Sequence, residues 1–156
     1  MEPMTALDRE KMIAHQCGRV ALAAKGEIGR RARPMGLSGP EALLLAIVSI
    51  HGSSTLAELA RLLKHAHPSV LRHIDVLERR GYIERTPHPT DRRVKVVSLT
   101  SEGEKVAPEI REIIRKVNKL ATKGLDAATV ELLLRLLQRV AANLGVEQEG
   151  SHAAQD

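Results

Sequence analysis

Residues 55–103 read TLAELARLLKHAHPSVLRHIDVLERRGYIERTPHPTDRRVKVVSLTSEG, and this stretch decides the fold. It begins with Thr55 and Glu58, whose spacing is that of a capping box and predicts a short helix over 56–63. A second helix over 68–80 follows after a short break, because apolar residues recur on one of its faces. These residues are Val70, Ile74 and Leu77.

The rest of this stretch predicts a β-hairpin. Residues 82–86 and 94–98 are strand-like, and the loop 87–93 between them is basic and rich in turn residues. Two helices joined by a tight turn and followed by a hairpin with a basic tip form a winged helix-turn-helix. The predicted fold class is therefore mainly α with a small β-hairpin, in which this domain is joined to a helical dimerisation region.

Amphipathic helices are predicted on both sides of the winged domain. An apolar stripe at helical spacing ends before Pro34 and consists of Ile13, Cys17, Val20, Ala24 and Ile28. A capping box from Ser38 to Glu41 opens a largely buried helix over 42–50. We expect four regions: an N-terminal dimerisation helix (1–34), the winged domain (38–100), a C-terminal helical hairpin for dimerisation (101–146) and a disordered tail (147–156).

The predicted C-terminal hairpin carries two coiled-coil-like seams. The first helix is expected to begin with a cap at Thr100 or Ser101, with Glu104 as the partner of Ser101, and Pro108 is expected to kink it or delay its start. A turn and cap at 124–126 precede the second helix. The seam residues step by threes and fours, and they are Val106, Ile110, Ile113, Val117, Leu120, Val130, Leu133, Leu137, Val140 and Leu144.

The chain has 156 residues and a net charge of +5, and all of the excess charge lies in one segment. Between Arg61 and Lys95 there are nine Lys or Arg against four Asp or Glu, whereas the remaining chain holds fifteen of each. Duplex DNA carries about one phosphate charge per 1.7 Å of its axis, so basic side chains on a projecting surface favour its binding. The location of the charge points to double-stranded DNA as the partner.

Side chains on the outer face of the 68–80 helix are candidates for reading base edges in the major groove. With the three apolar residues facing the core, the opposite side carries Pro68, Ser69, Arg72, Val76 and Arg79. Arg72 suits a bidentate contact with guanine, whereas Arg79 lies farther along and suits phosphate. His65 and His67 at the turn can also meet phosphate. The hairpin tip adds Asp91, Arg92 and Arg93.

Residues 55–103 resemble the MarR family of winged helix-turn-helix transcriptional regulators. That family carries an Asp-x-Arg tip, a strand and then Leu-Thr-x-x-Gly. The pattern here reads Asp91-Arg92-Arg93 and, after the strand, Leu99-Thr100-Ser101-Glu102-Gly103. The chain departs from the family at the turn between the two helices, where Lys64-His65 replaces a common Gly-Val pair.

The resemblance implies a function and a set of roles. The wing arginine of the family enters the minor groove and the aspartate orients it, and these roles map onto Arg93 and Asp91. A narrow minor groove concentrates negative potential, which attracts a guanidinium. The resemblance also implies a homodimer on a pseudo-palindromic operator, and a repressor that a small-molecule effector releases. We expect the amphipathic helices to form the dimer interface, and an intramolecular hairpin is the alternative for the C-terminal seams.

Cys17 is the only cysteine of the chain and a candidate redox residue. The resemblance places it near the reactive thiol of the peroxide-sensing branch of the family. That branch also uses tyrosines beside the thiol, whereas the only tyrosine here, Tyr82, belongs to the strand region. Because Cys17 also belongs to the apolar stripe, a packed thiol is the simpler interpretation. A redox-responsive regulator is kept as the alternative to an effector-controlled one.

Other classes of function have weaker support. The sequence has no nucleophile–base pairing, Gly-rich phosphate loop or metal-ligand spacing, so neither an enzyme nor a cofactor is expected. His65, His67 and His73 are not expected to converge on a metal. His15 and His51 are candidates for an effector pocket with nearby arginines, which would favour an anionic ligand. A winged interaction module without DNA binding is a further alternative, and the basic tip argues against it.

The sequence also predicts where the protein resides. The N-terminal residues contain no apolar run of signal-peptide length, and nowhere do about 18 consecutive apolar residues occur. We therefore expect a soluble, cytoplasmic protein.

Overall fold

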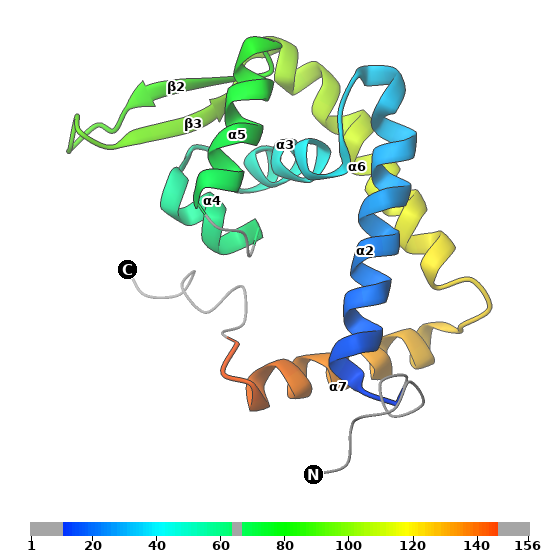
Figure 1. Ribbon diagram of the computed structural model, residues 1–156. Helices are drawn as coiled ribbons and strands as arrows, with labels where there is room; N and C mark the ends of the chain where they lie inside the picture. Colours follow the sequence, from blue (N-terminus) through cyan, green and yellow to red (C-terminus); the bar gives the residue numbers. More distant parts are fainter. Residues whose placement is uncertain (1–10, 64–66, 147–156) are drawn as a thin grey trace, which may run out of the picture. The chain divides into compact units, whose positions relative to one another are not determined.

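The computed structural model describes residues 11–63 and 67–146, which form a mainly helical structure with one small sheet (Figure 1). The predicted tail and the turn residues Lys64 and His65 lie outside the described residues. The chain divides into two compact units, Met1–Asn118 and Lys119–Asp156, and each is described by itself. The elements are α2 (Ile13–Ala32), the 3-10 helix η1 (Arg33–Met35), α3 (Gly39–His51), β1 (Ser54–Thr55), α4 (Leu56–Leu63), α5 (His67–Arg79), β2 (Ile83–Pro87), β3 (Lys95–Leu99), α6 (Ser101–Ala121) and α7 (Ala127–Asn143).

Both predicted capping boxes are present at the N-termini of α3 and α4. The backbone N–H of Ser38 donates to Glu41 Oε2 at 2.8 Å, and the N–H of Glu41 donates back to Ser38 Oγ. At α4 the backbone N–H of Thr55 donates to Glu58 Oε2 at 2.6 Å, and the N–H of Glu58 donates to Thr55 Oγ1 at 3.3 Å. Each box satisfies amide groups that have no partner within the helix, which fixes where the helix starts.

The sheet contains the predicted hairpin and one strand that was not predicted. β2 and β3 pair antiparallel, with Ile83 opposite Leu99. Both strands begin and end one residue later than the sequence predicts. The strand β1 pairs antiparallel with the other edge of β3, which gives the order β1-β3-β2. Because β1 has only two residues, it is too short for an alternating pattern to reveal it. In Figure 1 the hairpin projects away from α4 and α5.

The core of the first unit is aliphatic and joins the helices to the sheet. Val70, Ile74 and Leu77 of α5 are fully buried, as predicted from their spacing. The other largest buried side chains come from α3, α4, both hairpin strands and α6, and they are Leu44, Leu45, Val48, Leu59, Ile83, Val97 and Ile110. The buried face of α5 therefore fixes which of its other side chains face outward.

Four residues, Gly81, Tyr82, Thr100 and Gly103, form a junction between the end of α5 and the start of α6. Gly81 follows the end of α5 and has a positive φ of 73°, which stops the helix. The hydroxyl of Thr100 donates to the Gly81 carbonyl oxygen, and the backbone N–H of Thr100 donates to the Tyr82 carbonyl oxygen at 3.1 Å. The N–H of Gly103 then donates to Thr100 Oγ1 at 3.1 Å. Thr100 therefore caps α6.

For α6 the structure selects between alternatives that the sequence left open. The cap comes from Thr100 and not from a box between Ser101 and Glu104, because the threonine hydroxyl is held by Gly81 in the position that the Gly103 amide needs. Pro108 does not delay the helix, which already begins at Ser101. The first seam is also largely covered within the chain, since Ile110 and Val117 are buried in the core and only its last residue, Leu120, is exposed.

The helix α7 of the second unit has an unpartnered apolar surface. It starts at the predicted cap, where the Thr129 amide donates to Asp126 Oδ1 at 2.8 Å and holds the pKa of that carboxyl below its usual value. None of its residues is buried. Its exposed leucines are Leu132, Leu133, Leu134, Leu136 and Leu137. Such an apolar surface on a folded helix is typical of an interface with another chain.

The helices α2 and α3 cross where two glycines meet. A Cβ at Gly39 would overlap the carbonyl oxygen of Lys25, and a Cβ at Gly29 would lie 2.9 Å from the Gly39 nitrogen.

Among the residues that the structure describes, no single helix has the length and apolar composition needed to cross a membrane. Only α2 with η1 and α3 taken together meet that requirement, by length and composition, and this pair is bent by 84°.

The capping box at α4 predicts an acid-dependent contribution to stability. The Thr55 amide lowers the pKa of Glu58 below its ordinary value of 4.5, so the stabilisation is complete above that value and is lost as the pH falls through the lower folded-state pKa. We expect Glu58→Gln, which keeps an acceptor for the Thr55 amide but removes the charge at the helix N-terminus, to cost about 0.3–1 kcal/mol of unfolding free energy at neutral pH. Urea unfolding at pH 7 and pH 3 measures the difference.

The difference between wild type and Glu58→Gln is expected to shrink at the lower pH. Glu109→Gln, at an exposed position of α6, is the control and is expected to leave stability unchanged at pH 7. An equal difference at both pH values would contradict the role given to the Glu58 carboxylate.

Candidate nucleic-acid interface

The outer face of α5 is arranged largely as the sequence predicts. His67, Pro68, Arg72 and Arg79 are exposed, in line with their placement opposite the buried stripe. The other two predicted groove-facing residues, Ser69 and Val76, are half-buried at the flank of the helix. Two arginines thus project from one side of a helix whose opposite side is fixed in the core.

Asp75 belongs to the same outer region of α5 and was not predicted. Its position follows from the helical repeat, because it lies three residues after Arg72 and four before Arg79. The Nε of Arg79 donates to the Asp75 carbonyl oxygen at 3.2 Å, which directs this side chain back along the helix. The outer face of α5 therefore offers both cationic donors and a carboxylate acceptor.

The tip of the hairpin holds Arg93 in one orientation by means of Asp91. The backbone N–H and the Nε of Arg93 both donate to Asp91 Oδ1, at 3.1 and 3.0 Å, and Nη2 donates to Oδ2 at 3.2 Å. The Arg93 side chain is nevertheless 91% exposed. The guanidinium is therefore oriented by the tip and remains open to a partner, which is the geometry expected for insertion into a groove.

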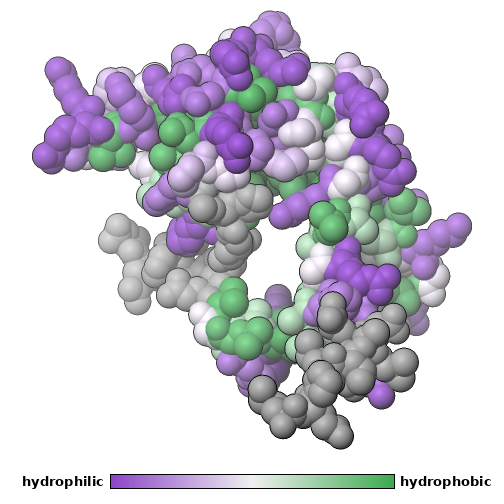
Figure 2. All heavy atoms as spheres, viewed as in Figure 1, coloured by the Kyte–Doolittle hydropathy of each residue, from purple (hydrophilic) through white to green (hydrophobic). Residues whose placement is uncertain are grey.

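Hydrogen bonds within the loop close the tip around this pair. The backbone N–H of His88 donates to the Val94 carbonyl oxygen, and the N–H of Val94 donates to the Asp91 carbonyl oxygen, both at 2.9 Å. The Arg93 side chain lowers the pKa of Asp91 by hydrogen bonding to the carboxylate, which keeps it ionised. Arg92 is exposed beside them. Figure 2 shows mostly hydrophilic side chains at the projecting end of the hairpin.

Arg85 in β2 is a second residue that sequence reasoning missed. Its Nη2 lies 2.9 Å from Asp75 Oδ1, and its Nε donates to Glu78 Oε2 at 3.0 Å. The available sequence clue was a pair of carboxylates three residues apart on α5, followed by an arginine in the next strand. The outer face of α5 and the hairpin are thus connected by ion pairs as well as by the chain.

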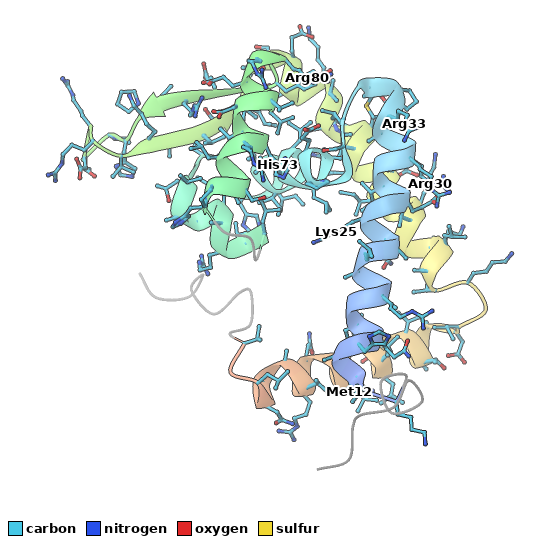
Figure 3. The ribbon with its side chains drawn as sticks, in the orientation of Figure 1. Met12, Lys25, Arg30, Arg33, His73 and Arg80 are labelled. Atoms are coloured by element: carbon cyan, nitrogen blue, oxygen red, sulfur yellow. The ribbon has the colours of Figure 1, made fainter. Side chains whose placement is uncertain are left out.

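Several charged and polar residues lie away from this surface. Figure 3 shows His73 on the side of α5 away from the hairpin, and its side chain is half-buried. Arg80 lies at the end of α5, where its guanidinium occupies the space that a Cβ on Gly36 would need. Within the described residues, no three His, Cys, Asp or Glu side chains gather into a metal-binding group.

The candidate effector and redox residues do not meet in one place. His15 lies ten residues before Lys25, and His51 lies at the far end of α3, which begins beside Lys25. Because the two helices are bent by 84° and a helix rises about 1.5 Å per residue, the two histidines are about 22–25 Å apart. Within one chain they do not line a common pocket. Cys17 is exposed on α2 rather than packed.

Comparison with known proteins finds similarity to transcriptional regulators, including members of the MarR family. Residues 35–94 match the model of the MarR family. The transcriptional regulator PA3341 is similar in structure, with a TM-score of 0.79 and 28% identity, over 87% of this chain and all of that one. A mutant MarR from E. coli in complex with operator DNA has a TM-score of 0.77 and 22% identity, over 87% and 98% of the chains. A MarR family transcriptional regulator from Listeria monocytogenes in complex with a 26mer DNA has a TM-score of 0.80 and 22% identity, over 86% and 89%.

Proposed function

Since residues 35–94 match the model of the MarR family, we propose that the chain is a winged helix-turn-helix transcriptional regulator of that family and binds a specific double-stranded DNA operator as a homodimer. The proposed mode of action is repression that ends when a small-molecule effector binds, as the family resemblance implies. The observation that carries DNA binding is the oriented, exposed Arg93 at the tip of the hairpin, next to a helix that exposes Arg72 and Arg79. The net positive charge of the chain is concentrated on these same elements.

The proposed geometry assigns different tasks to the two elements. The N-terminal part of α5 enters the major groove, where Arg72 has the donor geometry to contact guanine. The hairpin tip then reaches the adjacent minor groove with Arg93, and Arg79 contacts phosphate. Because a single winged domain reads one half-site, a two-fold operator requires a second copy about one DNA turn away.

The exposed apolar residues of α7, α2 and α6 support the homodimer. In addition to the leucines of α7, large apolar side chains are exposed near the start of α2 and the end of α6. They are Met12, Ile13, Val20, Leu22 and Leu120. A stable interface needs apolar surface of this kind at its centre.

Titration of a fluorescent duplex from the promoter next to the protein's own gene, over a series of salt concentrations, tests DNA binding. We expect a strong decrease of log affinity with log salt concentration, because the bound protein releases counterions from the phosphates. Competition with duplexes of unrelated sequence tests specificity. Binding that is absent, or that does not change with salt, would overturn the proposal and favour a winged module that binds another protein.

Replacing Arg93 by alanine is expected to weaken binding to the operator duplex by about tenfold or more, since a well-placed arginine contact contributes about 1–3 kcal/mol. The same titration measures the loss, with the thermal unfolding midpoint as a check on folding. Glu84→Ala, an exposed change in β2, is the control and is expected to bind no more weakly than wild type. If Arg93→Ala binds the operator duplex with wild-type affinity, the proposed minor-groove contact of Arg93 is wrong.

The exposure of Cys17 favours one alternative mode of regulation. An exposed thiol on α2 is accessible to an oxidant, and α2 also carries apolar residues assigned to the dimer. Oxidation there would then change dimer geometry and release the DNA. Peroxide treatment of wild type and Cys17→Ser distinguishes the two modes, because a redox-responsive regulator loses operator binding only when the cysteine is present.

A further inference from the structure

Arg85 forms a brace between the hairpin and the DNA-facing helix. It lies in β2, and its guanidinium reaches two carboxylates of α5, those of Asp75 and Glu78. Both carboxylates come from the same side of the helix, because residues three apart are neighbours on a helix surface. Two donors of one rigid, planar group therefore hold two points of α5 against one strand.

The Arg85 guanidinium is less exposed than those of Arg31 and Arg93, which form other ion pairs, although its two carboxylate partners are partly exposed. The Arg85 side chain is 29% exposed, whereas that of Arg93 is 91% exposed. A fixed ion pair shielded in part from water is stronger than a fully exposed one. The Glu78 carboxylate raises the pKa of Arg85, and the Arg85 guanidinium lowers the pKa of Glu78.

The connection between α5 and β2 explains what such a brace does. The chain between the two elements is short and passes through Gly81, a residue with positive φ. The hairpin extends beyond this turn to its tip at Arg93, so a small rotation at Gly81 would move the tip far. The ion pairs of Arg85 act on the tip side of Gly81 and oppose that rotation.

Resting on the proposed function, we propose that Arg85 is a positioning residue for DNA binding, which sets the angle between α5 and the hairpin through Asp75 and Glu78. In this role Arg85 does not contact DNA. It keeps Arg93 at the distance from α5 that lets the tip and the helix enter neighbouring grooves together.

A double-mutant cycle between Arg85 and Arg93 tests this role. The affinity of the operator duplex is measured for wild type, Arg85→Gln, Arg93→Ala and the double variant. We expect Arg85→Gln to weaken binding by about tenfold, a loss in the range that charged hydrogen bonds contribute. A positioning role further predicts that Arg93→Ala costs less once Arg85 is gone, since the tip is then already misplaced.

The loss of operator affinity caused by Arg93→Ala decides the outcome. The brace is supported if this loss is at least about threefold smaller in the Arg85→Gln background than in wild type. A smaller difference between the two backgrounds overturns it. The salt series adds a second readout. In the Arg93→Ala background, Arg85→Gln should leave the slope unchanged, whereas a further reduction by about one unit would mean that Arg85 itself contacts phosphate and would overturn the proposal.

A second variant covers the case in which Arg85→Gln fails to fold. The combined change of Asp75→Ala and Glu78→Ala removes both partners of Arg85. It also removes two negative charges near the DNA, so electrostatics alone predicts tighter binding. Weaker binding supports the brace, and equal or tighter binding overturns it. If wild type itself shows no salt-sensitive binding, the proposed function has failed, and the role given to Arg85 in DNA binding fails with it.

Discussion

Replacing Gly103 by alanine is expected to lower the unfolding free energy by about 2–3 kcal/mol, the cost of forcing extra atoms into a packed site. The new Cβ would overlap the carbonyl oxygen of Tyr82 and lie 3.0 Å from its carbonyl carbon and 3.3 Å from Leu99 Cδ2. Because the obstacle is backbone, it cannot move aside as a flexible side chain does. The same shift would break the cap between Gly103 and Thr100. Urea unfolding followed by circular dichroism measures the loss.

A matched glycine provides the control. Gly26 lies inside α2, and a Cβ placed there would meet nothing within 4 Å. Gly26→Ala is therefore expected to stabilise the protein by about 0.5–1 kcal/mol, since alanine favours the helix. Equal effects of the two substitutions would show that the close contact at the junction is not needed for stability.

Placing glutamate at both Leu133 and Leu137 of α7 is expected to convert the dimer into monomers and to weaken operator binding by more than about a hundredfold. Both leucines lie on one stripe of the helix, with exposed fractions of 43% and 38%. Burying a carboxylate in an apolar interface is costly, and a monomer also loses the roughly hundredfold or larger gain from binding two half-sites at once. Analytical ultracentrifugation gives the mass, and duplex titration gives the affinity.

Gln138→Glu provides the matched control on the same helix. It adds a carboxylate next to Leu137 but on the polar side of α7, so dimer mass and operator affinity are expected to stay at wild-type values. A Leu133/Leu137 variant that remains a dimer would place the interface elsewhere, on α2 or α6. A variant that becomes a monomer and still binds with wild-type affinity would contradict the need for two copies.

The sequence predicts helices whose apolar residues recur at regular spacing, and it predicts the residues at which helices begin or end. The boundaries of α4 and α5 follow from Thr55, Glu58 and Gly81, whose local chemistry determines where a helix starts or stops. The buried face of α5 follows from its apolar spacing, and with it the exposure of Arg72 and Arg79. The roles of Asp91 and Arg93 were predicted only through the resemblance to the family's Asp-x-Arg tip, and in the structure the aspartate holds the arginine.

Features that depend on tertiary contact were not predicted. In the sequence Arg85 is only a residue of a predicted strand, because its contact with Asp75 of α5 forms when the chain folds. Thr100 and Ser101 are equivalent caps in sequence, and only the carbonyl of Gly81 selects Thr100. The first seam indicates an amphipathic helix but does not specify whether its partner is the same chain or another. The described structure shows that Ile110 and Val117 of this seam lie in the chain's own core.

The junction has a practical consequence for spectroscopy. Tyr82 is the only tyrosine of a chain without tryptophan or phenylalanine, and its half-buried side chain packs against the core. All of the protein's intrinsic ultraviolet fluorescence therefore comes from one ring, placed between α5, β2 and the start of α6. Unfolding or binding kinetics can be recorded at that point without an attached dye.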